Sequence, residues 1–246
     1  MSRTFQHDIR NLAYSQTQGR GPGIVFLGGF RSDMEGTKAR YLEEWAISRG
    51  RAFLRFDYSG HGASSGNFLN GSIGEWAEDA AAIIDGLTEG PQLLVGSSMG
   101  GWISLLLARE MPGRVGGLVT IAAAPDFTDR LWETLGESER TTLMTTGQLA
   151  RLSVYSDAPY VFTKKLIEDG RKRRIFGNAL SLNCPTRFLH GTDDRDVDPA
   201  VSLALMDHAE GKDIRLTLVK GADHRFSDPD CLGLIVDAIE DVTTRM

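Results

Sequence analysis

The feature that most constrains the fold of this chain is a strand, a tight turn and a helix over residues 92–107. Residues 93–95 have the length and apolar composition of a buried parallel strand. That strand runs directly into Gly96-x-Ser98-x-Gly100, and an apolar helical pattern follows. This layout predicts a sharp, strained turn, because a side chain at either glycine would collide with the strand or the helix. Such a turn exposes the serine hydroxyl at a helix N-terminus, where a developing anion is stabilised. Ser98 is therefore the candidate nucleophile.

A second Gly-x-Ser-x-Gly pattern occurs at residues 62–66, with Ser64 at its centre. The residues before it, 58–61, have the composition of a loop, and residues 67–71 do not predict a helix. Because the strand and the helix are both lacking, we interpret this match as accidental and Ser98 as the nucleophile.

Composition restricts the class of protein and its partners. The chain has 246 residues, of which 41% are hydrophobic and 24% charged, as in an ordinary globular protein. A net charge of −6 and a pI near 5.4 argue against nucleic acid or an anionic membrane as partner. No apolar run approaches the roughly 20 residues of a membrane span. The N-terminus has no apolar signal-peptide core, and Cys184 and Cys231 stand far apart. We therefore expect a cytoplasmic protein without disulfide, metal or cofactor, and the sequence leaves its oligomeric state open.

Alternation of apolar strands with amphipathic helices predicts an α/β fold with a doubly wound, mostly parallel sheet. The expected strands are residues 24–27, 52–56, 93–95, 117–122, 186–190 and 214–219, after an N-terminal edge strand or hairpin. The alternation of strands and helices stops between residues 126 and 183, where we expect helical segments and no strand. The sequence thus predicts a core of residues 1–125 and 184–246 with a helical cap insertion, residues 126–183.

A serine hydroxyl needs a base to take its proton and an acid to orient that base. In a doubly wound fold these groups lie on loops at the carboxyl ends of strands. His224 is the histidine that follows the last expected strand, and we predict it to be the base. Asp194, after the preceding strand, is the predicted acid. The other acids that remain as alternatives are Asp193, Asp196 and, in another loop, Asp126. The other histidines are expected to be solvated (His7), at the surface (His208) or structural (His61 and His190).

The oxyanion of the reaction would be held by backbone N–H groups. One comes from Met99, the residue after the nucleophile, and the other from the loop after the first buried strand, where we choose Phe30. Arg31 beside it would either hold a substrate carboxylate or pair with Asp33 or Asp57.

Three motifs together resemble the α/β-hydrolase superfamily across nearly the whole chain: Gly96-x-Ser98-x-Gly100, His190-Gly191-x-x-Asp194-x-x-Val197 and Gly221-x-x-His224. Asp57-x-x-Gly60-His61-Gly62-x-Ser64 matches a structural turn of that superfamily. A finer resemblance is to the α/β-hydrolase-domain family of mitochondrial acyl-protein thioesterases and mycophenolic acid acyl-glucuronide esterases. It is carried by Gly29-Phe30-x-Ser32-Asp33-Met34-x-Gly36-Thr37-Lys38-Ala39 and by residues 53–66. The resemblance implies hydrolysis of esters or thioesters.

The expected cap insertion carries both aromatic and basic residues. Trp132 and Tyr160 are candidates for binding substrate, and the wider set that would line an acyl pocket or pack the cap is Leu135, Leu143, Met144, Leu149, Tyr155 and Phe162. The run Arg171-Lys172-Arg173-Arg174 would either attract an anionic leaving group or form a solvated helix face.

These observations predict a serine hydrolase that cleaves carboxylic esters or thioesters through an acyl-enzyme. Its substrate would be a small-molecule ester or thioester, or an acylated protein. Two alternatives remain, a peptidase or amidase with the same three residues and a ligand-binding module without turnover on this fold.

Overall fold

The computed structural model describes residues 2–152 and 159–246. Its centre is an eight-stranded sheet with the order β1-β2-β4-β3-β5-β6-β10-β12. β1 and β2 form an antiparallel hairpin, β2 also pairs antiparallel with β4, and the pairs from β4 to β12 are parallel. The strand bounds are β1 (Arg3–His7), β2 (Arg10–Thr17), β3 (Arg20–Leu27), β4 (Arg51–Phe56), β5 (Gln92–Ser97), β6 (Val115–Ile121), β10 (Thr186–Gly191) and β12 (Ile214–Val219). The predicted doubly wound, mostly parallel sheet is confirmed.

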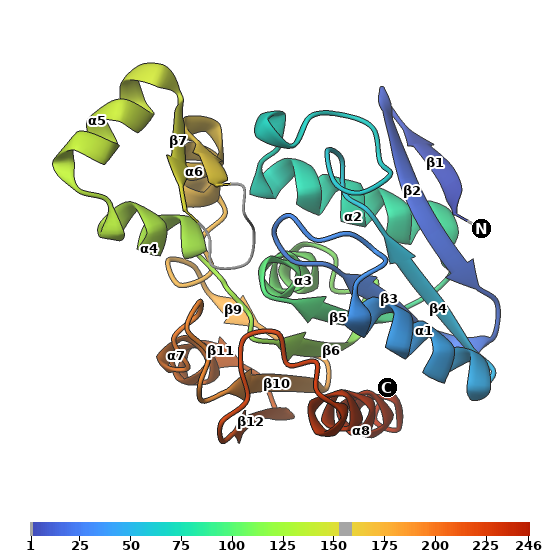
Figure 1. Cartoon of the computed structure of the whole chain (residues 1–246). Coiled ribbons are helices and arrows are strands. Elements are labelled where there is room, and N and C mark those ends of the chain that lie inside the picture. The colour runs from blue at the N-terminus through green and yellow to red at the C-terminus, as the bar shows by residue number, and fades with distance from the viewer. Residues whose placement is uncertain (1, 153–158) are drawn as a thin grey trace.

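Helices cover both faces of this sheet, as Figure 1 shows. On one face α2 (Ile73–Leu87) and α3 (Met99–Glu110) bury apolar side chains such as Trp76 and Trp102. On the other face α1 (Thr37–Ser48) and α8 (Pro229–Thr243) pack Leu42 and Ile239 in a second cluster. The central sheet is therefore covered by a separate apolar cluster on each face.

Local sequence signals set the starts of these helices. Ser72 Oγ accepts a hydrogen bond from the Glu75 backbone N–H at the start of α2. The Asp228 carboxylate accepts one from Cys231 N–H, so α8 begins at Pro229 as the Asp-Pro pair predicts. A short 3-10 helix, η1 (Phe68–Asn70), precedes α2, and α7 (Ala200–His208) lies between β10 and β12.

The segment between β6 and β10 differs from the strand-free insertion that the sequence predicts. It holds α4 (Phe127–Thr134), α5 (Glu137–Thr146), β7 (Gln148–Arg151), β8 (Tyr160–Thr163), α6 (Lys164–Lys172) and β9 (Leu180–Ser181). β7 and β8 form an antiparallel pair, and β9 pairs with β11 (Ala209–Glu210). The expectation of helices alone was wrong because four residues are too few for periodicity to separate a strand from a helix. In Figure 1 α4, α5, β7 and α6 form a lobe beside the central sheet.

Candidate active site

Ser98 lies on the turn between β5, which ends at Ser97, and α3, which begins at Met99. Its φ is 54° and its ψ −116°, in a region that side chains rarely adopt. A Cβ atom at Gly96 would clash with the Gly100 carbonyl oxygen, and one at Gly100 with the Leu27 carbonyl oxygen. The two glycines are therefore required for the strained turn that the sequence predicts at Ser98.

Two residues from distant loops complete a hydrogen-bonded chain with Ser98. His224 Nε2 lies 3.2 Å from Ser98 Oγ, and His224 Nδ1 lies 2.8 Å from Asp194 Oδ2. Asp194 follows β10 and His224 follows β12, so both are on loops at the carboxyl ends of parallel strands. The structure brings together the three residues that the sequence predicted as nucleophile, acid and base.

The carboxylate of Asp194 is fully buried and accepts hydrogen bonds at both oxygens. Oδ1 accepts from the backbone N–H of Asp196 and of Val197, each at 2.9 Å. Oδ2 lies 3.1 Å from His190 Nε2 as well as 2.8 Å from His224. Burial, the largest single influence, raises the pKa of Asp194, but the hydrogen bonds from His190, His224 and Val197 together hold that pKa well below its usual range. Asp194 is thus an ionised, fixed acceptor for His224.

The alternative acids are placed differently. Asp126 accepts hydrogen bonds from Ile175 and Phe176 N–H at 2.8 and 3.0 Å, which joins the start of α4 to the chain after α6. Asp193 is exposed and lies 4.0 Å from Arg195. Among the described residues, Asp194, Asp196 and His224 are the one group of three that could hold a metal ion. Asp194 and His224 are already hydrogen-bonded to each other there, so the arrangement is explained without a metal.

Side chains with structural roles account for the second serine motif and the other histidines. Ser64 Oγ donates to the Asp57 carbonyl oxygen at 2.6 Å and accepts from Ala13 N–H at 2.8 Å. His61 is enclosed by aromatic rings, and burial lowers its pKa to about 4. His208, expected at the surface, is half-buried, with Nε2 2.8 Å from the Asn178 carbonyl oxygen.

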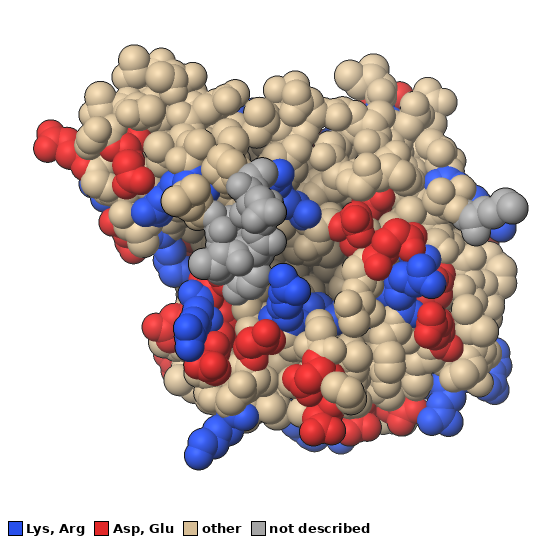
Figure 2. Space-filling view, in the orientation of Figure 1, with Lys and Arg blue, Asp and Glu red and all other residues tan. Residues whose placement is uncertain are grey.

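A cavity of about 550 Å³ opens at Ser98 and His224. Phe30 and Met99, the predicted oxyanion donors, both line it. The chain before Phe30 lies against the nucleophile, since a Cβ atom at Gly29 would be 3.4 Å from the Ser98 Cβ atom. Figure 2 shows the hollow in this face of the molecule. The residues predicted as oxyanion donors, nucleophile and base therefore all line one cavity.

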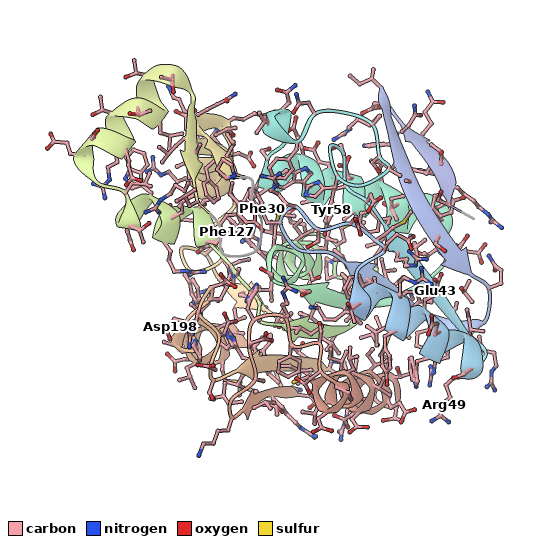
Figure 3. All side chains as sticks on the ribbon, viewed as in Figure 1. Phe30, Glu43, Arg49, Tyr58, Phe127 and Asp198 are labelled. Carbon is pink, nitrogen blue, oxygen red and sulfur yellow. The ribbon has the colours of Figure 1, made fainter. Side chains whose placement is uncertain are left out.

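One wall of this cavity is aromatic. The Phe30 ring stacks on Phe162 at 5.6 Å and meets Phe127 edge-on at 5.6 Å. Tyr160 lies 6.2 Å from Phe30 and lines the same cavity. Figure 3 labels Phe30 and Phe127 close together, between the sheet and the lobe. The predicted place of Tyr160 in the pocket agrees with this. Phe127 was missed because its contact with Phe30, 97 residues earlier, leaves no trace in the local sequence.

Comparisons with known proteins identify the family. Residues 24–231 match the alpha/beta hydrolase family. The palmitoyl-protein thioesterase ABHD10, mitochondrial, of Bos taurus is 36% identical over 240 residues, which are 97% of this chain and 78% of that protein. The Homo sapiens protein of the same name has the same identity and coverage. The chain belongs to the alpha/beta hydrolase family. The structure of the alpha/beta hydrolase domain-containing protein 10 from mouse superposes with a TM-score of 0.92 and 34% identity, over 98% of this chain and 97% of that one.

The predicted fold, family and hydrolase class are confirmed by these similarities, and the predicted esterase or thioesterase function agrees with them. The predicted cytoplasmic location was wrong, because the relatives that match nearly the whole chain are named as mitochondrial. That prediction rested on few cysteines and on the N-terminus. Unpaired cysteines are compatible with any reducing compartment, so they do not distinguish a cytoplasmic from a mitochondrial location. In the described part of this hydrolase no helix is long and apolar enough to cross a membrane.

In the described part of the chain Arg31 pairs with neither Asp33 nor Asp57, the two acids considered from the sequence. Its guanidinium lies over the rings of Phe68 and Tyr160, at 5.5 and 5.1 Å, and donates to the Pro159 carbonyl oxygen at 3.2 Å. Asp57 instead accepts from the Met34 and Ala63 N–H groups. Arg31 therefore joins the loop after β3 to η1 and to the start of β8, a role that depends on groups far away in the sequence.

Trp132 was predicted to bind substrate and lies elsewhere in this hydrolase. It packs with Leu135, Leu143, Leu149 and Ile167 in a small core inside the lobe. Arg140 and Arg171 lie over its ring at 5.3 and 4.7 Å. Of the other pocket candidates, Met144 is exposed and Tyr155 lies outside the described residues.

The basic run at residues 171–174 does not line the cavity at Ser98. Arg171 and Arg174 both pair with Asp129, and Arg173 lies 4.0 Å from Asp169. The pairs with Asp129 connect the C-terminal end of α6 with α4. The pair of Arg173 with Asp169 joins residues four positions apart. Of the two roles considered from the sequence, the helix face fits this placement better than the attraction of a leaving group, and the ion pairs add contacts that neither role included.

Proposed function

We propose that this hydrolase is a serine thioesterase that removes long acyl groups from proteins, with esters as further substrates. The observation that carries the proposal is the hydrogen-bonded chain Ser98–His224–Asp194 at the mouth of an aromatic cavity. One further fact supports it: the relatives that match nearly the whole chain are named palmitoyl-protein thioesterases.

In the proposed mechanism Ser98 Oγ attacks the thioester carbonyl carbon while His224 Nε2 takes the hydroxyl proton. Asp194 holds His224 in the tautomer that carries hydrogen on Nδ1 and stabilises the imidazolium. The carbonyl oxygen gains negative charge and accepts hydrogen bonds from the Met99 N–H at the α3 N-terminus and from the Phe30 N–H in the loop after β3. Collapse expels the thiolate, which receives the proton from His224. Water then attacks the acyl-serine carbonyl carbon while His224 Nε2 takes its proton. Collapse releases the carboxylic acid, and His224 returns the proton to Ser98 Oγ.

The acyl group would lie along the aromatic wall formed by Phe30, Phe127, Tyr160 and Phe162. Burial of each methylene is worth about 0.8 kcal/mol, so a long chain gains more from such a wall than an acetyl group does. Three of these four residues come from the segment between residues 126 and 183. We therefore propose that this segment acts as a cap that selects substrate, while residues 1–125 and 184–246 carry the chemistry.

A panel of acyl-cysteine thioesters and p-nitrophenyl esters from two to sixteen carbons tests the proposal. We expect kcat/KM to rise with chain length and to be higher for thioesters, and Ser98→Ala to abolish both turnover and labelling by a fluorophosphonate. Ser64→Ala is the control and should keep labelling. Faster cleavage of aminoacyl-naphthylamides than of esters would favour the peptidase alternative. Saturable binding of the panel without turnover would favour the binding module.

A further inference from the structure

The loop that carries His224 has an unusual backbone. Phe226, two residues further on, has a φ of 49°, although it is not glycine. Such a conformation costs of order 1–3 kcal/mol and persists only where surrounding groups hold it. The Phe226 side chain is completely buried in the core beneath, and its N–H donates to the Asp223 carboxylate at 3.0 Å. Contacts on both sides of His224 therefore fix the path of this loop.

A third contact comes from Lys38 of α1, which lines the same cavity. The ammonium group of Lys38 donates to the Arg225 carbonyl oxygen at 2.5 Å and lies 3.4 Å from Ser227 Oγ. Arg225 directly follows His224, so Lys38 holds the peptide beside the base. The residues between Gly29 and Ala39 form one of the motifs noted above, and neither the nucleophile nor the oxyanion donors explain its lysine.

We propose that Lys38 is a positioning residue, whose ammonium holds the Arg225 carbonyl and thereby keeps His224 Nε2 within reach of Ser98 Oγ. This inference rests on the proposed role of His224 as the base. Lys38 does not act on the substrate, although it lies in the wall of the same cavity. Its partners are 187 and 189 residues away in the chain, which makes the contact a link between α1 and the last loop of the sheet.

The charged and titratable groups that face Lys38 are Asp223, Arg225 and Cys231. Burial lowers the pKa of Lys38 to about 8, although Asp223 acts in the opposite direction. The ammonium is therefore charged at neutral pH and loses its proton above pH 8, which weakens a charge-assisted hydrogen bond. Activity that depends on this contact is present below the folded pKa and is lost as the pH rises through it.

Three variants test the proposal with a short p-nitrophenyl ester: Lys38→Met, Lys38→Arg and, as a control on the same helix, Arg40→Met. Arg40 is exposed and pairs with Glu35 and Glu44. We expect K38M to lower kcat about 10- to 100-fold with little change in KM, because a small displacement of a catalytic group has effects of that size. K38R should keep most of the activity, and R40M all of it.

Two readouts separate positioning from a general structural role. In the wild type kcat/KM should fall above about pH 8, and in K38R this fall should disappear because arginine keeps its charge. The melting temperature of K38M should stay unchanged or rise at pH 7, because burying the ammonium opposes folding. An unchanged kcat in K38M, or a fall near pH 8 that persists in K38R, would overturn the proposal. Ser98→Ala is measured in parallel, since activity in that variant would overturn the proposed function instead.

Discussion

The Asp194 carboxylate accepts hydrogen bonds from two backbone N–H groups and lies within hydrogen-bond distance of two histidines. Substitution of this residue therefore tests its role as the acid. Asp194→Asn would place an amide N–H₂ group against the histidines and favour the wrong tautomer of His224. We expect kcat to fall by about 10⁴, as loss of the orienting carboxylate does in such triads. Asp193→Asn is the matched control, because Asp193 directly precedes Asp194 and its side chain is exposed. It should change kcat little. A large loss in D193N with a small one in D194N would place the acid one residue earlier.

The same carboxylate links stability to pH. The folded pKa of Asp194 is lower than the value of about 3.9 in an unfolded chain. Its contribution is therefore fully present above pH 4 and is lost as the pH falls through the lower folded pKa. We expect D194N to melt below the wild type at pH 7, with the gap narrowing toward pH 3. Thermal unfolding of both proteins across this range measures it, and a gap that widens on acidification would contradict the assigned shift.

The residues of the site differ in how far the sequence could predict them. Ser98 was predictable because its strand, glycines and helix are contiguous, and His224 because one histidine follows the last strand. The choice of Asp194 over its neighbours depends on a turn in which its own carboxylate accepts two backbone N–H groups. The hydrogen bonds of Arg31 to Pro159 and of Lys38 to Arg225 were not predictable, since each joins residues more than a hundred positions apart.

Strand β8 supplies two of the four aromatic residues of the cavity wall, so a single substitution there tests the acyl subsite. Phe162→Ala should lower kcat/KM for a sixteen-carbon thioester about 10-fold and for an acetyl thioester far less, because only the long chain reaches the lost surface. Val161→Ala, the neighbour on the opposite side of the strand, is the control. Equal losses for both chain lengths would mean that Phe162 supports the lobe and does not bind the acyl chain.

The basic run begins in the last turn of α6 and continues past its end, and its ion pairs predict that it does not bind an anionic substrate. Replacing Arg171 and Arg174 by glutamine removes their pairing with Asp129. We expect the ratio of KM values for an acyl-coenzyme A and a neutral ester to stay within about two-fold, since exposed charges away from the site are screened within about 10 Å at 0.1 M salt. A selective rise in KM for the anionic substrate would restore a binding role to this run.

Elements with strong local signals were predicted well. The starts of α2 and α8 can be recognised from Ser72 and Asp228 alone, because an N-cap side chain bonds to an N–H group three residues further on. β7 and β8 were missed, since each has four residues and their pairing with each other is not visible in either alone. Trp132 was wrongly predicted to lie in the cavity. Nothing in its local sequence shows whether it packs in the cavity or in the small core of the lobe.

At the scale of the molecule, the parallel sheet is what brings the site together. β5, β10 and β12 end on the same edge, so the loops with Ser98, Asp194 and His224 meet although up to 126 residues separate them. The order of elements in the sequence predicted this arrangement. The shape of the cavity was not predictable, because it depends on how the lobe of α4, α5, β7 and α6 packs over that edge (Figure 1).

Trapping of the acyl-enzyme tests the central claim most directly. The protein is mixed with a palmitoyl-cysteine peptide thioester, quenched in acid within the first turnovers and analysed by intact mass and peptide mapping. We predict the mass of one palmitoyl group on the peptide that carries Ser98, and no such adduct in Ser98→Ala. A palmitoyl adduct on another residue, or thioester turnover that persists in Ser98→Ala, would contradict the account.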